Sequence, residues 1–165
     1  MSADRVSIRA AVPADALALS RMAQEFADEL ERLPVAADAP DVPEPEDAVL
    51  TPDVFSRDIF GAQPLAFVLV AERGGDCVGY LMFHFGYWPA DAAASLHVVD
   101  LFVRPAARRS GLGRALMEEA ARVLRVKGGK RIIWTVWDQN HPAMAFYQRL
   151  GARFFSEERL MTWMR

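Results

Sequence analysis

The stretch that decides the fold covers residues 99–114 and reads Val99-Asp-Leu-Phe-Val-Arg-Pro-Ala-Ala-Arg-Arg-Ser-Gly-Leu-Gly-Arg114. Its first part is rich in β-branched and aromatic residues and predicts a strand. A basic loop with two glycines follows and leads directly into a long helix. A helix N-terminus presents unpaired amides and the positive end of the helix dipole, which suit a phosphate group. The stretch therefore predicts an anion-binding junction, with an ordinary connection carrying surface arginines as the alternative.

Two common phosphate-binding motifs do not fit this junction. A dinucleotide fingerprint needs glycines at its first, third and sixth positions, and none begins here. A P-loop ends in Gly-Lys followed by Ser or Thr, whereas Gly113 is followed by Arg114 and Ala115. The loop therefore matches neither of these two motifs.

Hydrophobic spacing predicts the elements on either side of the junction. The predicted strands cover residues 6–11, 65–72, 77–87, 95–103, 131–137 and 154–164. The predicted helices cover residues 13–33, 51–59, 111–128 and 142–150. This order predicts an α/β chain in which helices cover a mixed sheet.

Length and composition exclude several classes of protein. The chain has 165 residues, 52% of them hydrophobic, which suits one globular domain over residues 1–165 and not a disordered chain. No apolar run approaches the ~20 residues of a membrane span. Cys77 is the single cysteine and the three histidines are far apart, so neither a disulfide nor a metal site is expected. The net charge of −3 argues against nucleic acid as a partner, and a cytoplasmic protein is expected.

The overall charge conceals an acidic segment at residues 34–58. Seven acidic residues and one arginine give this segment a charge of −6, which leaves +3 on the rest of the chain. Half of the ten prolines also lie here, and proline opposes both helix and central strand. Residues 34–50 are therefore predicted to form a long acidic loop, which is either functional or a solvated surface.

A second motif strengthens the prediction from residues 99–114. The loop Arg108-x-x-Gly111-x-Gly113 resembles the acetyl-CoA loop of the GNAT N-acetyltransferase superfamily. Downstream, Asn140-x-x-Ala143-x-x-Phe146-Tyr147-x-x-x-Gly151 resembles the second cofactor motif of the same superfamily. The two motifs stand in the right order, separated by a helix and a strand. The resemblance implies a GNAT fold, with a mostly antiparallel mixed sheet whose parallel fourth and fifth strands splay apart.

Other stretches are similar to the diamine branch of that superfamily, the spermidine/spermine or thialysine acetyltransferases. These stretches are residues 50–61, 79–83, 87–89 and 99–103. That branch carries an acidic pair before its fourth-strand Phe-Phe-Val, whereas this chain has Val99 followed by Asp100. The loss of one acid predicts a wider acceptor range and weaker binding of long polyamines.

The resemblance implies a set of residues that bind acetyl-CoA as co-substrate. The pantetheine arm would bond to the backbone of the fourth strand and the pyrophosphate to the loop amides, while Arg108 adds charge. Asn140 and Ala143 would contact the cofactor from the second motif. The strand and loop residues are Leu101, Phe102, Val103, Arg109, Ser110, Gly111, Leu112, Gly113 and Arg114.

Tyr147 and Asp100 are the catalytic candidates. A tyrosine, with an ordinary pKa near ~10, keeps its proton at neutral pH and can donate it to a departing thiolate. Packing beside Phe146 is the alternative role of Tyr147. Asp100 can orient an ammonium group or accept its proton, directly or through water, provided that desolvation makes the carboxylate more basic. A strand-end carboxylate satisfied by backbone amides is the alternative for Asp100.

The sequence thus predicts an N-acetyltransferase that acts on a small primary amine, such as a diamine or a lysine-like amine, by direct transfer in a ternary complex. A protein or peptide N-acetyltransferase and a CoA-binding regulatory module without catalysis are the alternatives. No membrane partner is expected. The resemblance also implies a homodimer.

Overall fold

A computed structural model describes residues 6–34 and 49–155 of the chain. It divides into two compact units, Met1–Thr135 and Val136–Arg165, which are described separately. The predicted acidic loop at residues 34–50 lies outside the described residues apart from its two ends.

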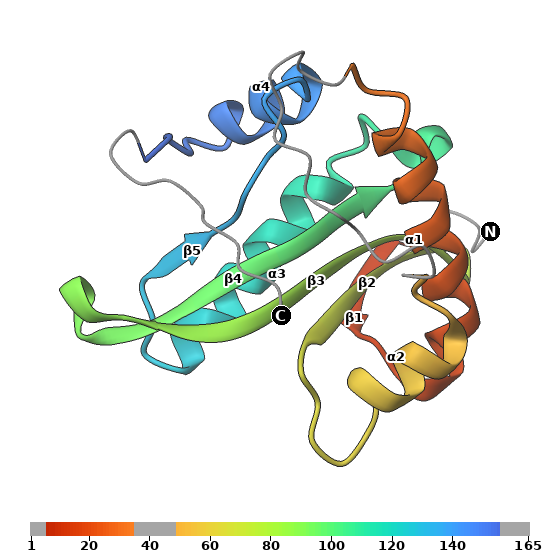
Figure 1. The fold of residues 1–165 in the computed structure, drawn as a ribbon, viewed down its shortest axis with the longest axis horizontal. Coiled ribbons are helices and arrows are strands. Elements are labelled where there is room, and N and C mark those ends of the chain that lie inside the picture. The colour runs from red at the N-terminus through yellow and green to blue at the C-terminus, as the bar shows by residue number, and fades with distance from the viewer. Residues whose placement is uncertain (1–5, 35–48, 156–165) are drawn as a thin grey trace, which may run out of the picture. The chain divides into compact units, whose positions relative to one another are not determined.

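The first unit holds a five-stranded sheet in the order β1-β2-β3-β4-β5 (Figure 1). The first four strands are antiparallel, and β4 and β5 are parallel. The two-residue loop between β2 and β3 is Gly74-Gly75, and both glycines have positive φ, as a tight hairpin requires. The strands are β1 Val6–Ala10, β2 Phe67–Arg73, β3 Asp76–Trp88, β4 Ala93–Val103 and β5 Arg131–Ile133.

Three helices of the described residues cover this sheet, and one of them, α2, has a side-chain cap. Helix α1 spans Ala16–Leu30 after a 3-10 turn at Pro13–Asp15, so the predicted helix over residues 13–33 is shorter at both ends. Helix α2 spans Pro52–Asp58, and the Thr51 hydroxyl caps it by accepting from the Val54 amide. Helix α3 spans Leu112–Val126.

The apolar residues of the strands alternate between the two faces of the sheet. One face packs against α1 and α2 through Val68, Val70, Tyr80, Met82 and Phe102. The intervening strand residues point to the opposite face, which α3 covers with its buried apolar side chains. In Figure 1, α3 passes behind β3 and β4. The mixed sheet with helices on both faces confirms the predicted fold class.

The fifth strand is shorter than predicted. β5 ends at Ile133, and residues 134–137 are not a strand, although the apolar run suggested one through Trp137. β5 pairs with β4 only from Ser95 to His97, and among the described residues no strand pairing continues past Ile133 to complete the backbone hydrogen bonds. The pairing of the two parallel strands ends there, and their splaying stays a prediction.

The second unit holds helix α4, His141–Arg149, one residue away from its predicted bounds. Gly151 follows it with a φ of 91°, which suits the left-handed end of a helix. Residues 152–155 form no strand, and the rest of the predicted final strand at 154–164 lies outside the described residues.

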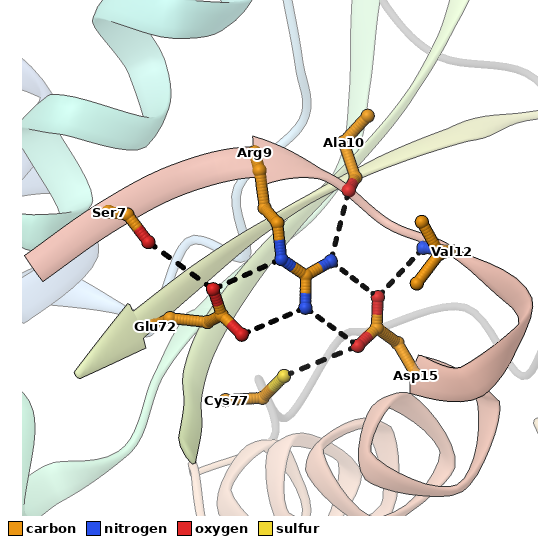
Figure 2. A network of polar contacts seen from close by, with 7 residues as sticks. All are labelled: Ser7, Arg9, Ala10, Val12, Asp15, Glu72 and Cys77. Atoms are coloured by element: carbon orange, nitrogen blue, oxygen red, sulfur yellow. Dashed lines mark hydrogen bonds and ion pairs between the residues drawn. The ribbon is translucent and has the colours of Figure 1, made fainter. Parts of the chain in front are cut away.

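A network of charges fastens the first strand to its neighbours (Figure 2). The Arg9 guanidinium lies between two carboxylates and bonds to both, at 2.7 Å from Asp15 and 2.9 Å from Glu72. Asp15 also accepts from the Val12 amide, and the Cys77 thiol lies 3.7 Å from it. Since Asp15 is buried, these donors stabilise its charged form and lower the pKa of its carboxyl, chiefly through Arg9.

We expect Asp15→Asn to destabilise the chain by about 2 kcal/mol at pH 7, because a charged hydrogen bond to Arg9 is lost. The pKa of folded Asp15 lies below its unfolded value of 3.8, so this stabilisation is complete above that value. It disappears as the pH falls through the lower, folded pKa. Urea unfolding from pH 7 to pH 2 should therefore show the difference between the variant and the unsubstituted chain narrowing below about pH 4.

Asp58→Asn is the matched control for this measurement. Asp58 forms an ion pair with its exposed neighbour Arg57, and surface pairs of this kind contribute little. A difference between Asp15→Asn and the unsubstituted chain that stays constant down to pH 2 would contradict the role given to Asp15.

Candidate active site

The loop between β4 and α3, which the sequence predicts to bind an anion, leads directly into the N-terminus of α3. Gly111 is the N-cap of α3 and has a φ of 84°, and Arg109 has a φ of 61°. The Ser110 hydroxyl donates to the Ala107 carbonyl at 2.6 Å, which fixes the turn. Leu112 is buried and anchors the first turn of α3. The glycine-containing loop is therefore continuous with the N-terminus of α3, and a helix N-terminus favours an anion.

Arg108 forms side-chain hydrogen bonds to other residues of the first unit. Its guanidinium bonds to both carboxylate oxygens of Glu29 on α1, at 2.7 and 2.6 Å, and its Nε donates to the Val103 carbonyl. Arg104, which follows the last residue of β4, bonds to both carboxylate oxygens of Glu25 through its Nε and one terminal nitrogen. Glu25 and Glu29 are one helical turn apart, and sequence reasoning did not find them. These contacts show that Arg108 braces the loop against α1 in addition to any contact with an anion.

Arg114 lies in the first turn of α3, and its side chain is 54% exposed beside Glu118 at 3.7 Å. Gly113 precedes it within the same turn. The Arg114 side chain is therefore more exposed than that of Arg108, which is 42% exposed, and Arg109 is exposed as well.

The outer part of β4 has an open edge. The ladder with β5 covers Ser95 to His97, whereas the ladder with β3 continues to Val103. The side of Leu101, Phe102 and Val103 that faces away from β3 therefore has no strand partner among the described residues. Such an edge accepts an extended chain by adding hydrogen bonds. This is the backbone arrangement that the pantetheine prediction needs.

Asp100 lies on β4 just before this open edge. Its carboxylate accepts a hydrogen bond from the Tyr80 hydroxyl, with an Oη to Oδ2 distance of 3.0 Å. Burial raises the pKa of Asp100, and the bond from Tyr80 opposes that rise. The desolvation that the base role requires is therefore present. The partner is a tyrosine hydroxyl and not the backbone amides of the alternative role.

Val99 occupies a β-bulge beside Asp100. Asp100 pairs with Met82 and Val98 pairs with Phe83, so Val99 is an extra residue with no partner on β3. The bulge places Asp100 on the α1–α2 face, with Phe102, while Val99 is 51% exposed. Val99 stands where the diamine branch has the first acid of its pair, so that position is exposed in this chain.

The histidines do not form a metal centre. His84 and His97 pair across β3 and β4 with ring centroids 5.0 Å apart, and burial together with His84 lowers the pKa of His97. Within the described ranges, no group of three or more His, Cys, Asp or Glu side chains is arranged to hold a metal ion. None of the described helices combines the length and apolar character needed to cross a bilayer. The homodimer and the cytoplasmic location stay predictions.

The second unit carries the remaining predicted residues on α4. Asn140 is the N-cap, and its side-chain oxygen accepts from the Ala143 amide at 3.2 Å, which leaves the NH2 half of the side chain as the donor for a ligand. Tyr147 follows seven residues later, about two turns along, and so projects on the same side of α4. Its ring packs against Phe146, with centroids 5.1 Å apart.

The fold and the motifs define an acetyltransferase. Residues 23–152 match the family model described as the Acetyltransferase (GNAT) family. The chain belongs to this family and is an N-acetyltransferase.

Its relatives fit the diamine and thialysine branch. The thialysine N-epsilon-acetyltransferase of Bos taurus is 30% identical over 118 residues, which cover 66% of this chain and 68% of that protein. The Caenorhabditis elegans enzyme of the same name is 38% identical over 47% of this chain and 48% of its own length. The L-ornithine N5-acetyltransferase of Arabidopsis thaliana is 34% identical over 50% of this chain and 36% of its own.

Solved structures share the fold at low sequence identity. An integron cassette protein from the mobile metagenome of V. cholerae has a TM-score of 0.77 and 20% identity, and the match covers 100% of this chain and 94% of that one. A ribosomal-protein-alanine N-acetyltransferase from Brucella melitensis has a TM-score of 0.73 and 16% identity, over 97% of this chain and 100% of its own.

Proposed function

We propose that the chain transfers an acetyl group from acetyl-CoA to a small primary amine that carries a second positive charge, by direct transfer in a ternary complex. The observation that carries this proposal is the desolvated Asp100 carboxylate beside the open edge of β4. Relatives named for thialysine and ornithine support it, because both compounds are amino acids with a second amino group.

The residues of the first unit fit acetyl-CoA. The open edge at Leu101–Val103 suits the pantetheine amides, and the amides of residues 109–114 suit the pyrophosphate. When bound, acetyl-CoA supplies an acetyl thioester that an unprotonated amine can attack. Asn140 in the second unit offers its side-chain NH2 to the cofactor chain.

Asp100 and Tyr147 each perform one proton transfer: Asp100 takes a proton from the acceptor, and Tyr147 gives one to the leaving group. The ordinary pKa of a primary amine is ~10.4, so at neutral pH the acceptor arrives as ammonium and has to lose a proton before it can attack. Asp100 accepts that proton, directly or through water. Tyr147 donates its phenolic proton to the departing sulfur and recovers one from the acetylated nitrogen through solvent. The role of Tyr147 rests on the family motif and on the chemistry of a phenol.

Steady-state kinetics with matched monoamines and diamines test the substrate class. The diamine of each pair, for example 1,3-diaminopropane against propylamine, should have the higher kcat/KM. Added salt should reduce this advantage, because it screens the acidic segment at residues 34–58 and Asp100. Asp100→Asn should bring the two acceptors towards parity. Asp76→Asn, which removes an exposed acid at the β2–β3 turn, should keep the preference.

Three outcomes would overturn parts of this proposal. A preference for neutral or acidic amines would make the acidic segment a solvated surface only. Transfer to peptide N-termini or lysines in place of small amines would favour a protein acetyltransferase. Cofactor binding with no thiol release from any acceptor would favour a regulatory module.

A further inference from the structure

The hydroxyl of Tyr80 is a polar group in the core of the first unit. The Tyr80 side chain is fully buried on β3 and packs against Phe102, with ring centroids 6.2 Å apart. A phenylalanine ring would fill the same apolar space, so packing does not require the hydroxyl. The hydroxyl donates to Oδ2 of Asp100 at 3.0 Å. A buried tyrosine hydroxyl needs such a partner, and here the partner is the proposed base.

The carboxylate of Asp100 is held at one oxygen only. Oδ2 accepts from Tyr80, whereas Oδ1 accepts no hydrogen bond from the residues that the structure describes. Asp100 is half-buried, so part of the residue remains accessible from outside the core. The bulge at Val99 interrupts the ladder beside it. One side of the carboxylate is thus fixed from the core and the other is open to a ligand.

Resting on the proposed function, we propose that Tyr80 is a positioning residue for Asp100: its buried hydroxyl fixes Oδ2 and leaves Oδ1 to take the proton of the acceptor ammonium. The bond restricts the rotation of the carboxylate, so that Oδ1 keeps one direction relative to the β4 edge. It also stabilises the ionised form that a base requires.

The electrostatics of the pair agree with this role. Burial raises the pKa of Asp100, and the Tyr80 bond lowers it. Burial and the charge of Asp100 raise the pKa of Tyr80, so the hydroxyl keeps its proton and remains a donor. On α1, which packs over this face, Glu25 and Glu29 are paired with arginines. Among the described residues, Tyr80 is the titratable group whose hydrogen bond shifts the pKa of Asp100.

Tyr80→Phe tests the proposal through the pH dependence of kcat/KM. Without the donor, the pKa of Asp100 should rise, so the low-pH limb should move upward by about one pH unit, the size of one charged hydrogen bond. The loss should be largest at low pH and shrink as the pH increases. In an Asp100→Asn background, Tyr80→Phe should have little further effect.

Met82→Leu is the matched control, because Met82 lies in the same core and pairs with Asp100 but leaves the Tyr80 hydroxyl in place. It should lower thermal stability without moving the pH profile. If Tyr80→Phe lowers kcat/KM by the same factor at every pH, the hydroxyl does not act through the ionisation of Asp100 and the proposal fails.

A second measurement separates this inference from the proposed function. Carbon NMR titration of aspartate-labelled protein, with Asp100 assigned by its loss in Asp100→Asn, follows the carboxyl without any turnover. A higher Asp100 pKa in Tyr80→Phe supports the pairing, and an unchanged pKa overturns it. If the unsubstituted chain releases no thiol with any amine, the proposed function fails, while the titration still decides whether Tyr80 controls Asp100.

Discussion

Tyr147→Phe is expected to lower kcat about 10²-fold, the usual contribution of one general acid. Phenylalanine keeps the ring that packs on Phe146, so α4 should remain folded and the affinity for acetyl-CoA should not change. The departing thiolate would then have to leave unprotonated or take its proton from water. Thiol release under saturating acetyl-CoA and amine measures the effect directly.

Tyr87→Phe is the control for Tyr147→Phe. It removes a hydroxyl from a tyrosine of β3 whose side chain is 66% exposed, and it should leave kcat unchanged. Calorimetry on both variants verifies cofactor binding. Full activity in Tyr147→Phe would make Tyr147 a packing residue and assign protonation of the sulfur to solvent.

Gly111→Asp is expected to weaken acetyl-CoA binding by about 10²-fold or more. The substitution places a carboxylate at the N-cap of α3, where the pyrophosphate would meet the loop amides, and the loss of two charged hydrogen bonds is sufficient for this factor. The residue also has a φ of 84°, which a side chain adopts only with strain. Isothermal calorimetry gives the change in Kd.

Gly128→Asp separates charge at the site from strain. Gly128 has a φ of 73° just beyond the other end of α3, and an added Cβ would meet no atom within 4 Å at either glycine. The two substitutions therefore carry the same charge and a similar backbone strain. Unchanged affinity in Gly111→Asp, or an equal loss in Gly128→Asp, would move the cofactor away from this loop.

Local patterns were sufficient to predict most elements of the first unit. The predicted helix at residues 51–59 and the predicted strands on either side of residues 73–76 lie close to α2, β2 and β3, because caps such as Thr51 and tight turns such as Gly74-Gly75 depend on neighbouring residues. The prediction for β5 was wrong beyond Ile133, because an apolar run does not reveal where the neighbouring strand stops pairing.

The sequence by itself determined the family and the positions of its two motifs. Spacing within residues 99–114 and 140–151 is a local property, and it identifies the chemistry of a loop or a helix end. Asp100 and Gly111 could be singled out on that basis.

Only the tertiary structure decided which partners these residues have. Tyr80 and Asp100 are 20 residues apart, and Arg108 and Glu29 are 79 apart. Strand register and the bulge at Val99 bring the first pair together, and the packing of α1 brings the second. Contacts of this kind depend on how distant elements bury their apolar faces, which no local pattern of residues contains.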